Sequence, residues 1–322
     1  MELSFNAARI PSVFSIELAQ DEAAPVETPG RSVRTPLMAM AIVVVVWGMA
    51  PPVTKLVTAP PLIGTFVRFA ISSPILLLLL ALRRRPLRRR IFLATALPGL
   101  SFGINLIFVF ATLQEATVSV LSTISAMQPA LVLLMAGRLF GERPSSRQLG
   151  FTMIGVCGAV GVVLGAGSEL RTSWWGIGFA LLSLMTFTSY FVLTRLARAD
   201  GEVDPIEWMA GINIWAFLST IPPVVILADG SDWSQFGGTD WLWISVIAVV
   251  TGLFGHVLMT WVHGHIEVAR SSLYILTMHL VAVGLAWLIH GETISWVQAL
   301  AGVVVLSSVG FVITSPTRHA VR

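Results

Sequence analysis

The sequence Leu139-Phe140-Gly141-Glu142 returns 150 residues later as Ile289-His290-Gly291-Glu292, and each copy closes a long apolar stretch. The same offset aligns further pairs of identical residues: Val118 with Val268, Ser122 with Ser272, Ala136 with Ala286 and Gln148 with Gln298. These matches indicate an internal duplication. The Gly-Glu endings set the register between its two copies.

The composition is that of a membrane protein with many spans. The chain has 322 residues, 55% of them hydrophobic and 11% charged, and its mean hydropathy is +0.83. Soluble domains carry about 25% charged residues. The net charge of +3 does not indicate nucleic-acid binding, because the basic residues lie mainly in short connections between apolar segments. The single cysteine, Cys157, lies inside an apolar segment, so we expect no disulfide and no metal site.

Ten apolar runs have about the 20 residues that a bilayer crossing requires. Numbered 1 to 10, these spans are 37–56, 60–82, 91–113, 117–138, 148–167, 174–196, 207–228, 240–262, 270–290 and 294–315. The sequence therefore predicts an all-α membrane protein with ten transmembrane helices. We expect a flexible tail over 1–36, five-helix repeats over 37–167 and 174–315, and a second tail over 316–322. Met38 and Met40 are alternative starts that would leave span 1 intact.

Basic residues predict the orientation, since Lys and Arg gather on the cytoplasmic side of membrane proteins. With the N-terminus inside, 17 of the 20 basic residues fall in cytoplasmic segments. They are Arg9, Arg31, Arg34, Arg83, Arg84, Arg85, Arg88, Arg89, Arg90, Arg138, Arg143, Arg147, Arg195, Arg198, Arg270, Arg318 and Arg322. We expect a multi-pass protein of the inner or plasma membrane with both termini in the cytoplasm.

Five predicted spans separate the two Gly-Glu endings, and an odd number of crossings places them on opposite sides of the membrane. The two repeats are therefore expected to be inverted. Inverted repeats are typical of secondary transporters, whose substrate site lies where the repeats meet. Glu142 and Glu292 then lie too far apart to act as an acid pair. Each is expected to cap the helix that follows it or to meet a nearby basic residue.

Span 1 carries a proline pair, Pro51-Pro52, between Trp47 and Lys55. Proline lacks a backbone N–H and distorts a helix, which membranes tolerate where protein or water satisfies the freed carbonyls. A hinge beside a cavity and a static packing kink are both consistent with this pattern. Pro222-Pro223 in span 7 and Pro129 in span 4 raise the same question.

Polar side chains inside several spans predict the substrate site, because polar groups at this depth are costly and face a bundle interior or an aqueous cavity. They are Asn105, Gln128, Tyr190, His256 and His279. For each one, a hydrogen bond that only fixes helix packing is the alternative. With Trp47 and Met127 they form walls with few fixed charges, which favours a neutral, zwitterionic or amphipathic solute.

Charged groups near the membrane interior are few. Lys55 either extends outward to the interface or serves as a charge at the site. Arg68 either binds a carboxylate or pairs with Glu115. No acidic residue is expected at mid-membrane depth. If transport is proton-coupled, the candidates are His256 and His279, because histidine changes its charge near neutral pH; neutral, hydrogen-bonded histidine is the alternative.

Trp47-Gly48 followed by Lys55 resembles the drug/metabolite transporter superfamily, and the chain is similar to its EamA-type ten-helix branch. Further matching positions are Phe66, Arg68, Ala111, Ala116, Pro129 through Gly141-Glu142, Ala269, Ser271, Ser272 and Gly291-Glu292. The resemblance covers residues 37–315. It implies a central cavity lined mainly by spans 1, 3, 4, 6, 8 and 9, and alternating access for small metabolites. The chain departs at His279, which aligns with Pro129 where the family usually has a second proline.

From this resemblance we expect a permease that exports a small metabolite, amino acid or drug-like solute, with no catalytic residue, metal or cofactor. A membrane-embedded transferase acting on a lipid-linked substrate is the alternative. It would need clustered carboxylates for Mg²⁺, and Asp200, Glu202 and Asp204 lack the helical spacing to share a metal. A receptor or scaffold that transports nothing is the third hypothesis. The expected partners are a small-molecule substrate and the lipid bilayer, and a monomer and a homodimer both stay open.

Overall fold

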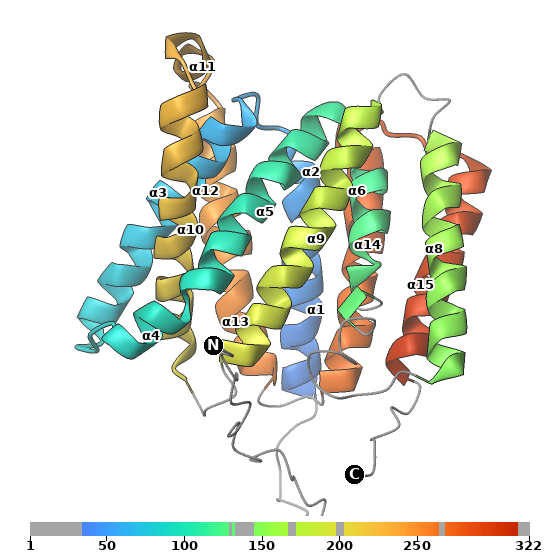
Figure 1. The fold of residues 1–322 in the computed structure, drawn as a ribbon, viewed down its shortest axis with the longest axis horizontal. Coiled ribbons are helices and arrows are strands. Elements are labelled where there is room, and N and C mark those ends of the chain that lie inside the picture. The colour runs from blue at the N-terminus through green and yellow to red at the C-terminus, as the bar shows by residue number, and fades with distance from the viewer. Residues whose placement is uncertain are drawn as a thin grey trace, which may run out of the picture. The chain divides into compact units, whose positions relative to one another are not determined.

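The structure, a computed structural model, describes residues 34–128, 131–132, 145–166, 172–197, 203–263 and 268–314. Every regular element in these residues is helical (Figure 1), which confirms the all-α prediction for them. Six helical segments are long and apolar enough to cross a membrane: Thr35–Thr54, Pro61–Leu82, Ala96–Glu115, Trp174–Thr194, Pro205–Leu227 and Asp240–Met259. The chain is therefore a multi-pass membrane protein, and ten crossings stay a prediction.

The helices of the first half follow the predicted spans closely. They are α1 (Arg34–Gly48), α2 (Ala50–Thr54), α3 (Pro61–Leu82), α4 (Arg89–Ala94), α5 (Ala96–Glu115), α6 (Val118–Ser125) and α8 (Ser146–Ala166). Two of these elements are continuations, since α2 follows α1 within span 1 and α5 follows α4 within span 3.

The second half adds two features that the sequence did not predict. Its elements are α9 (Trp174–Ala197), α10 (Pro205–Leu227), α11 (Gly230–Ser234), α12 (Asp240–Val246), η1 (Ile247–Phe254), α13 (Gly255–His263), α14 (Val268–His290) and α15 (Trp296–Thr314). The short helix α11 lies in the predicted outer loop. The π-helix η1 joins α12 to α13 within span 8.

The two proline pairs have different effects on their helices. Helical structure is interrupted between α1 and α2, just before Pro51-Pro52. Neither proline can donate to the carbonyl four residues earlier, which weakens the helix at this point. By contrast, α10 continues through Pro222-Pro223. The same sequence signal therefore accompanies a one-residue interruption at Met49, where the backbone stays in the α region and Met49 N still donates to the carbonyl of Val45 at 2.9 Å, and an unbroken helix in span 7.

The starts of α8 and α15 carry the same capping arrangement. In α8, Ser145 N donates to Gln148 Oε1 at 2.8 Å and Gln148 N donates to Ser145 Oγ at 3.2 Å. Ser295 and Gln298 make the equivalent bonds at 2.9 and 3.2 Å. This reciprocal arrangement is a capping box. Its two copies stand at the same offset as the Gly-Glu endings, so the duplication extends to local structure here.

Helices from the two halves are interleaved. The cross-half pairs are α3 with α10, α5 with α9, α6 with α14 and α8 with α15. Figure 1 shows α8 beside α15 along most of its length. The described residues from Thr35 onward form one unit.

Candidate functional site

Lys55, at the end of α2, forms an ion pair that joins the two halves. Its Nζ lies 2.7 Å from Glu292 Oε1 and donates to the carbonyl of Ala116 at 2.8 Å. The carboxylate of Glu292 also accepts bonds from Val118 N, at 3.0 and 3.1 Å. Because α6 begins at Val118, Glu292 supplies an acceptor for a backbone N–H that the helix leaves free.

These contacts bear on the alternatives stated for Lys55 and Glu292. The Lys55 amine turns to a carboxylate that is 1% exposed, at the ends of α5 and α14. Glu292 caps α6 in the other half rather than the following helix, α15. The nearby basic residue expected for Glu292 is Lys55. Sequence reasoning missed the pair because 237 residues separate its members and no local spacing links them. Pro129, Gly141 and Glu142 lie outside the described residues.

Arg68 lies in α3 and is only 8% exposed. It lines a small cavity together with Ser72, Phe102, Asn213, Gly252 and His256. The enclosed space is about 10 Å³, roughly the room that one water molecule needs. The lining helices α3 and α5 belong to the first half, and α10, η1 and α13 belong to the second.

The uncharged polar groups of this cavity are held in place. Ser72 Oγ donates to Asn213 Oδ1 at 2.7 Å, and Asn213 Nδ2 donates to the carbonyl of Met209 at 2.9 Å. The ring Nδ1 of His256 lies 2.7 Å from the carbonyl of Gly252. These contacts fix the orientation of the amide and the imidazole at the cavity wall.

Arg68 differs from these neighbours. Within the described part of the chain, no hydrogen bond or ion pair reaches its guanidinium. Its Cζ lies 5.9 Å from the ring centre of the adjacent Phe69. Glu115, the partner considered from the sequence, is exposed at the end of α5 and accepts a bond from Ser173. A buried charge without a partner is costly, and Arg68 differs in this from the other buried charged residues that the structure describes, Glu207, Asp240 and Glu292.

Three predicted substrate residues gather beside the cavity. The rings of Trp47 and His256 are 5.0 Å apart, and Phe102 lies 4.9 Å from Tyr190 and 6.1 Å from His256. The indole nitrogen of Trp47 is buried and has no hydrogen-bond partner among the described residues. Phe102, which the sequence analysis did not single out, contacts Tyr190 and His256, and His256 in turn contacts Trp47.

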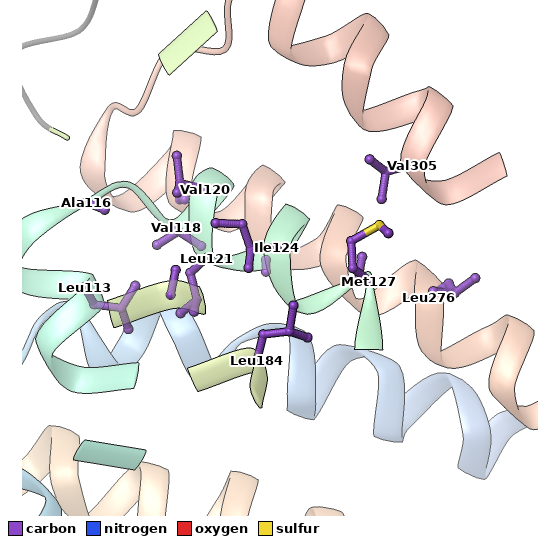
Figure 2. Close-up of a cluster of buried hydrophobic side chains, with 14 of the residues drawn as sticks. Leu113, Ala116, Val118, Val120, Leu121, Ile124, Met127, Leu184, Leu276 and Val305 are labelled. Atoms are coloured by element: carbon purple, nitrogen blue, oxygen red, sulfur yellow. The ribbon is translucent and has the colours of Figure 1, made fainter. Parts of the chain in front are cut away.

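The other predicted substrate residues lie elsewhere. Asn105 donates to the carbonyl and hydroxyl of Ser183 at 2.8 and 3.0 Å. These bonds join α5 to α9, which is the packing role considered as the alternative to substrate binding. Met127 packs in an apolar cluster with Ile124, Leu184 and Val305 (Figure 2).

Gln128 and His279 are half-buried in span 4 and in α14. The side-chain nitrogen of Gln128 is buried without a hydrogen-bond partner in the part of the chain that the structure describes. Neither residue is among those that line the cavity beside Arg68. The predicted site residues therefore do not form one cluster.

The π-helix η1 forms one wall of the cavity. A Cβ added to Gly252 in this helix would lie 3.7 Å from Arg68 Nη2. Short π-helical segments occur frequently at functional sites. The sequence Ile247–Phe254 is an ordinary apolar stretch, so hydropathy alone gave no signal for this geometry.

A further ion pair lies among the basic residues between spans 2 and 3. Arg88 Nη2 lies 2.8 Å from Glu207 Oε2, and the backbone N of Arg88 also donates to Glu207 at 2.8 Å. The hydrogen bond and the charge of Glu207 raise the pKa of the Arg88 guanidinium above its ordinary value. This pair fixes the connection between α3 and α4 to the start of α10.

These features define an all-helical, multi-pass membrane protein that encloses polar and charged groups between its spans. The model of the EamA-like transporter family matches residues 34–164 and 174–314. The chain belongs to this family and is a transmembrane transporter of the drug/metabolite type. The resemblance carried by Trp47, Lys55 and the Gly-Glu endings is thereby confirmed.

Two curated relatives are plastid translocators. The chain is 30% identical over 175 residues to phosphoenolpyruvate/phosphate translocator 1, chloroplastic, of Arabidopsis thaliana. It is 28% identical over 175 residues to the triose phosphate/phosphate translocator, non-green plastid, chloroplastic, of Brassica oleracea var. botrytis. Each alignment covers 53% of this chain and 42% of the relative. The match thus spans less than half the length of these relatives.

A solved crystal structure has the same fold. It resembles the chain with a TM-score of 0.59 and 16% sequence identity, over 88% of this chain and 97% of that one. At this identity the likeness concerns the arrangement of the helices alone.

Proposed function

We propose that this chain is a secondary transporter that moves a small solute by alternating access. The observation that carries the proposal is the polar cavity lined by helices of both halves, because a site at such a junction reaches either side when the halves rock. Membership of a transporter family supports the same function.

The proposed movement takes place between the repeats 37–167 and 174–315. The Lys55–Glu292 pair ties the halves together on the predicted outer side, and this contact would break when that side opens. The 150-residue offset maps Glu292 and Val118 onto Glu142 and Val268. We therefore expect an equivalent cap on the opposite side of the membrane.

The solute is a small metabolite, and its binding groups include Trp47, Tyr190 and His256. Their aromatic faces suit the neutral, zwitterionic or amphipathic solutes that the sequence predicted. The plastid relatives, named for phosphoenolpyruvate, triose phosphate and phosphate, add small anions to this range. We place the protein in the inner or plasma membrane with both termini in the cytoplasm, as the basic residues predict.

Uptake into proteoliposomes tests this function. Purified protein is reconstituted and offered radiolabelled amino acids, phosphorylated three-carbon acids and amphipathic drugs, and we expect uptake of at least one. Trp47→Ala is expected to lower that uptake tenfold or more. Trp296→Ala is the matched control, since Trp296 is 77% exposed at the start of α15. Absence of uptake of every solute by the wild-type protein would reject the proposal.

A further inference from the structure

We infer that Arg68 and Asn213 form an anion-binding site that receives the carboxylate or phosphate group of the transported solute. The assignment of the anion to a transported solute rests on the proposed transport function. The binding of an anion at Arg68 does not, because it follows from the local structure.

The first argument is the state of the Arg68 charge. Arginine stays protonated in proteins, so the guanidinium is a permanent cation inside the bundle. It is 8% exposed, and within the described residues no carboxylate or hydrogen-bond acceptor reaches it. Ionisable groups in membrane spans are costly and mark ligand or ion pathways. The missing counter-charge is supplied by an anionic ligand.

The second argument is the donor that Asn213 has left after its own hydrogen bonds. The hydrogen bonds from Ser72 to Asn213 Oδ1, and from Asn213 Nδ2 to Met209, fix the amide of Asn213. An amide nitrogen carries two N–H donors, so one remains for a ligand in the cavity that Asn213 and Arg68 both line. The cavity is therefore lined by a donor residue of α3 and a donor residue of α10.

The third argument is the space beside the guanidinium. Gly252 lies where any other residue would add a Cβ 3.7 Å from Arg68 Nη2. The absence of that carbon keeps one edge of the guanidinium accessible. Two parallel N–H groups of a guanidinium match the two oxygens of a carboxylate or phosphate. A neutral solute would leave the charge unpaired.

The cavity also indicates when the anion binds. Its volume of about 10 Å³ holds roughly one water molecule, which is too little for a carboxylate with its carbon atoms. The helices around Arg68 must separate before the anion enters. Because these helices come from both halves, entry is linked to the movement proposed for transport.

A binding experiment on the full-length protein in detergent tests the site. Melting temperature is measured against sodium phosphate, sodium acetate and neutral acetamide at constant ionic strength. We expect a concentration-dependent rise with phosphate or acetate and none with acetamide. The stronger of the two anions identifies a phosphorylated or a carboxylate solute.

Four variants locate the site. Arg68→Met is expected to weaken anion binding tenfold or more. Arg68→Lys and Gly252→Ala are expected to weaken anion binding by intermediate factors. Arg68→Lys keeps the charge but loses the two parallel N–H groups of the guanidinium. Gly252→Ala keeps the guanidinium but fills the space beside it. Arg88→Met is the matched control, because Arg88 is exposed and pairs with Glu207, and it should bind as the wild type. Equal anion binding by Arg68→Met and wild type, or an equal response to acetamide, overturns the site.

Uptake into proteoliposomes separates this inference from the proposed function. We expect Arg68→Met to lose uptake of anionic solutes at least tenfold. Uptake of the same anions by Arg68→Met at the wild-type rate would overturn the anion site and leave transport standing. Binding of phosphate through Arg68 without uptake of any solute would overturn the transport function and leave the site standing.

Discussion

Lys55 and Arg68 are two basic residues of the same half, thirteen positions apart, and their surroundings are opposite. Lys55 is 20% exposed and lies 2.7 Å from Glu292. Arg68 is 8% exposed and has no ion pair among the described residues. Both interrupt an apolar sequence in the same way. The difference is the carboxylate of Glu292, which comes from the other half. It gives the Lys55 charge a structural role, whereas the Arg68 charge has no such partner and is proposed to bind a ligand.

This difference has an energetic consequence. Breaking a buried ion pair leaves an uncompensated charge and destabilises a protein strongly. A buried charge that already lacks a partner destabilises the unliganded protein, and removing it relieves that cost. Functional sites commonly carry such a cost. Variants at the two positions are therefore expected to change stability in opposite directions.

The largest expected effect is that of Glu292→Ala. The substitution leaves the Lys55 amine without its carboxylate and Val118 N without its acceptor, so we expect a loss of about 3–5 kcal/mol in the free energy of unfolding. Denaturant unfolding of the protein in detergent, followed by tryptophan fluorescence, measures this loss.

Two further variants apportion the effect of Glu292. Glu292→Gln keeps an acceptor for Val118 N and is expected to lose less stability. Adding Lys55→Met to Glu292→Gln should recover part of the loss, because no charge is then left unpaired. Wild-type stability in Glu292→Ala would show that the pair contributes nothing and would remove the contrast with Arg68.

The second prediction is that Arg68→Met stabilises the unliganded protein, by about 1–2 kcal/mol, because it replaces an unpaired buried charge with an apolar side chain of similar length. The same unfolding measurement is made without added anions. Lys55→Met is the matched comparison and should destabilise. A loss of stability in Arg68→Met as large as that in Lys55→Met would make Arg68 a structural residue.

The sequence predicted the helices much better than their contacts. Span 60–82 was found as Pro61–Leu82 and span 174–196 as Trp174–Ala197, because a membrane requires continuous apolar helices of a set length. The π-helix Ile247–Phe254 was not predicted, since it has the same composition as an ordinary span.

The candidate site was predictable in part for a similar reason. A charge in an apolar run identifies Lys55 and Arg68 as unusual, so both appeared among the candidates. Their roles depend on which residues of the other half approach them, and the spacing along the chain does not contain that information. Asn105 illustrates the limit: it is polar at mid-span like His256, yet its bonds to Ser183 give it a packing role.

The smallest expected effect is that of Arg88→Ala, which tests whether any basic residue with an ion pair behaves like Lys55. The Arg88 side chain is 60% exposed, and solvent screens such pairs. Its backbone N still donates to Glu207 after the substitution. We therefore expect a loss of stability well below that of Glu292→Ala, measured against Arg83→Ala, an exposed arginine without an ion pair among the described residues.

Salt and pH separate this exposed pair from the buried one. Arg88 and Glu207 shift each other's pKa in opposite directions, upward for Arg88 and downward for Glu207. The stabilisation is therefore complete between the ordinary glutamate and arginine pKa values, and it is lost as the pH falls through the lowered pKa of Glu207 or rises through the raised pKa of Arg88. Stability differences between Arg88→Ala and wild type should therefore not vary near neutral pH. They should shrink as salt rises from about 0.01 to 1 M, over which the screening length falls from roughly 30 to 3 Å. The effect of Glu292→Ala should persist in high salt, since the carboxylate of Glu292 is shielded from solvent in the wild-type protein. Equal salt sensitivity of the Glu292→Ala and Arg88→Ala effects would show that the Lys55 pair is as exposed to solvent ions as the Arg88 pair.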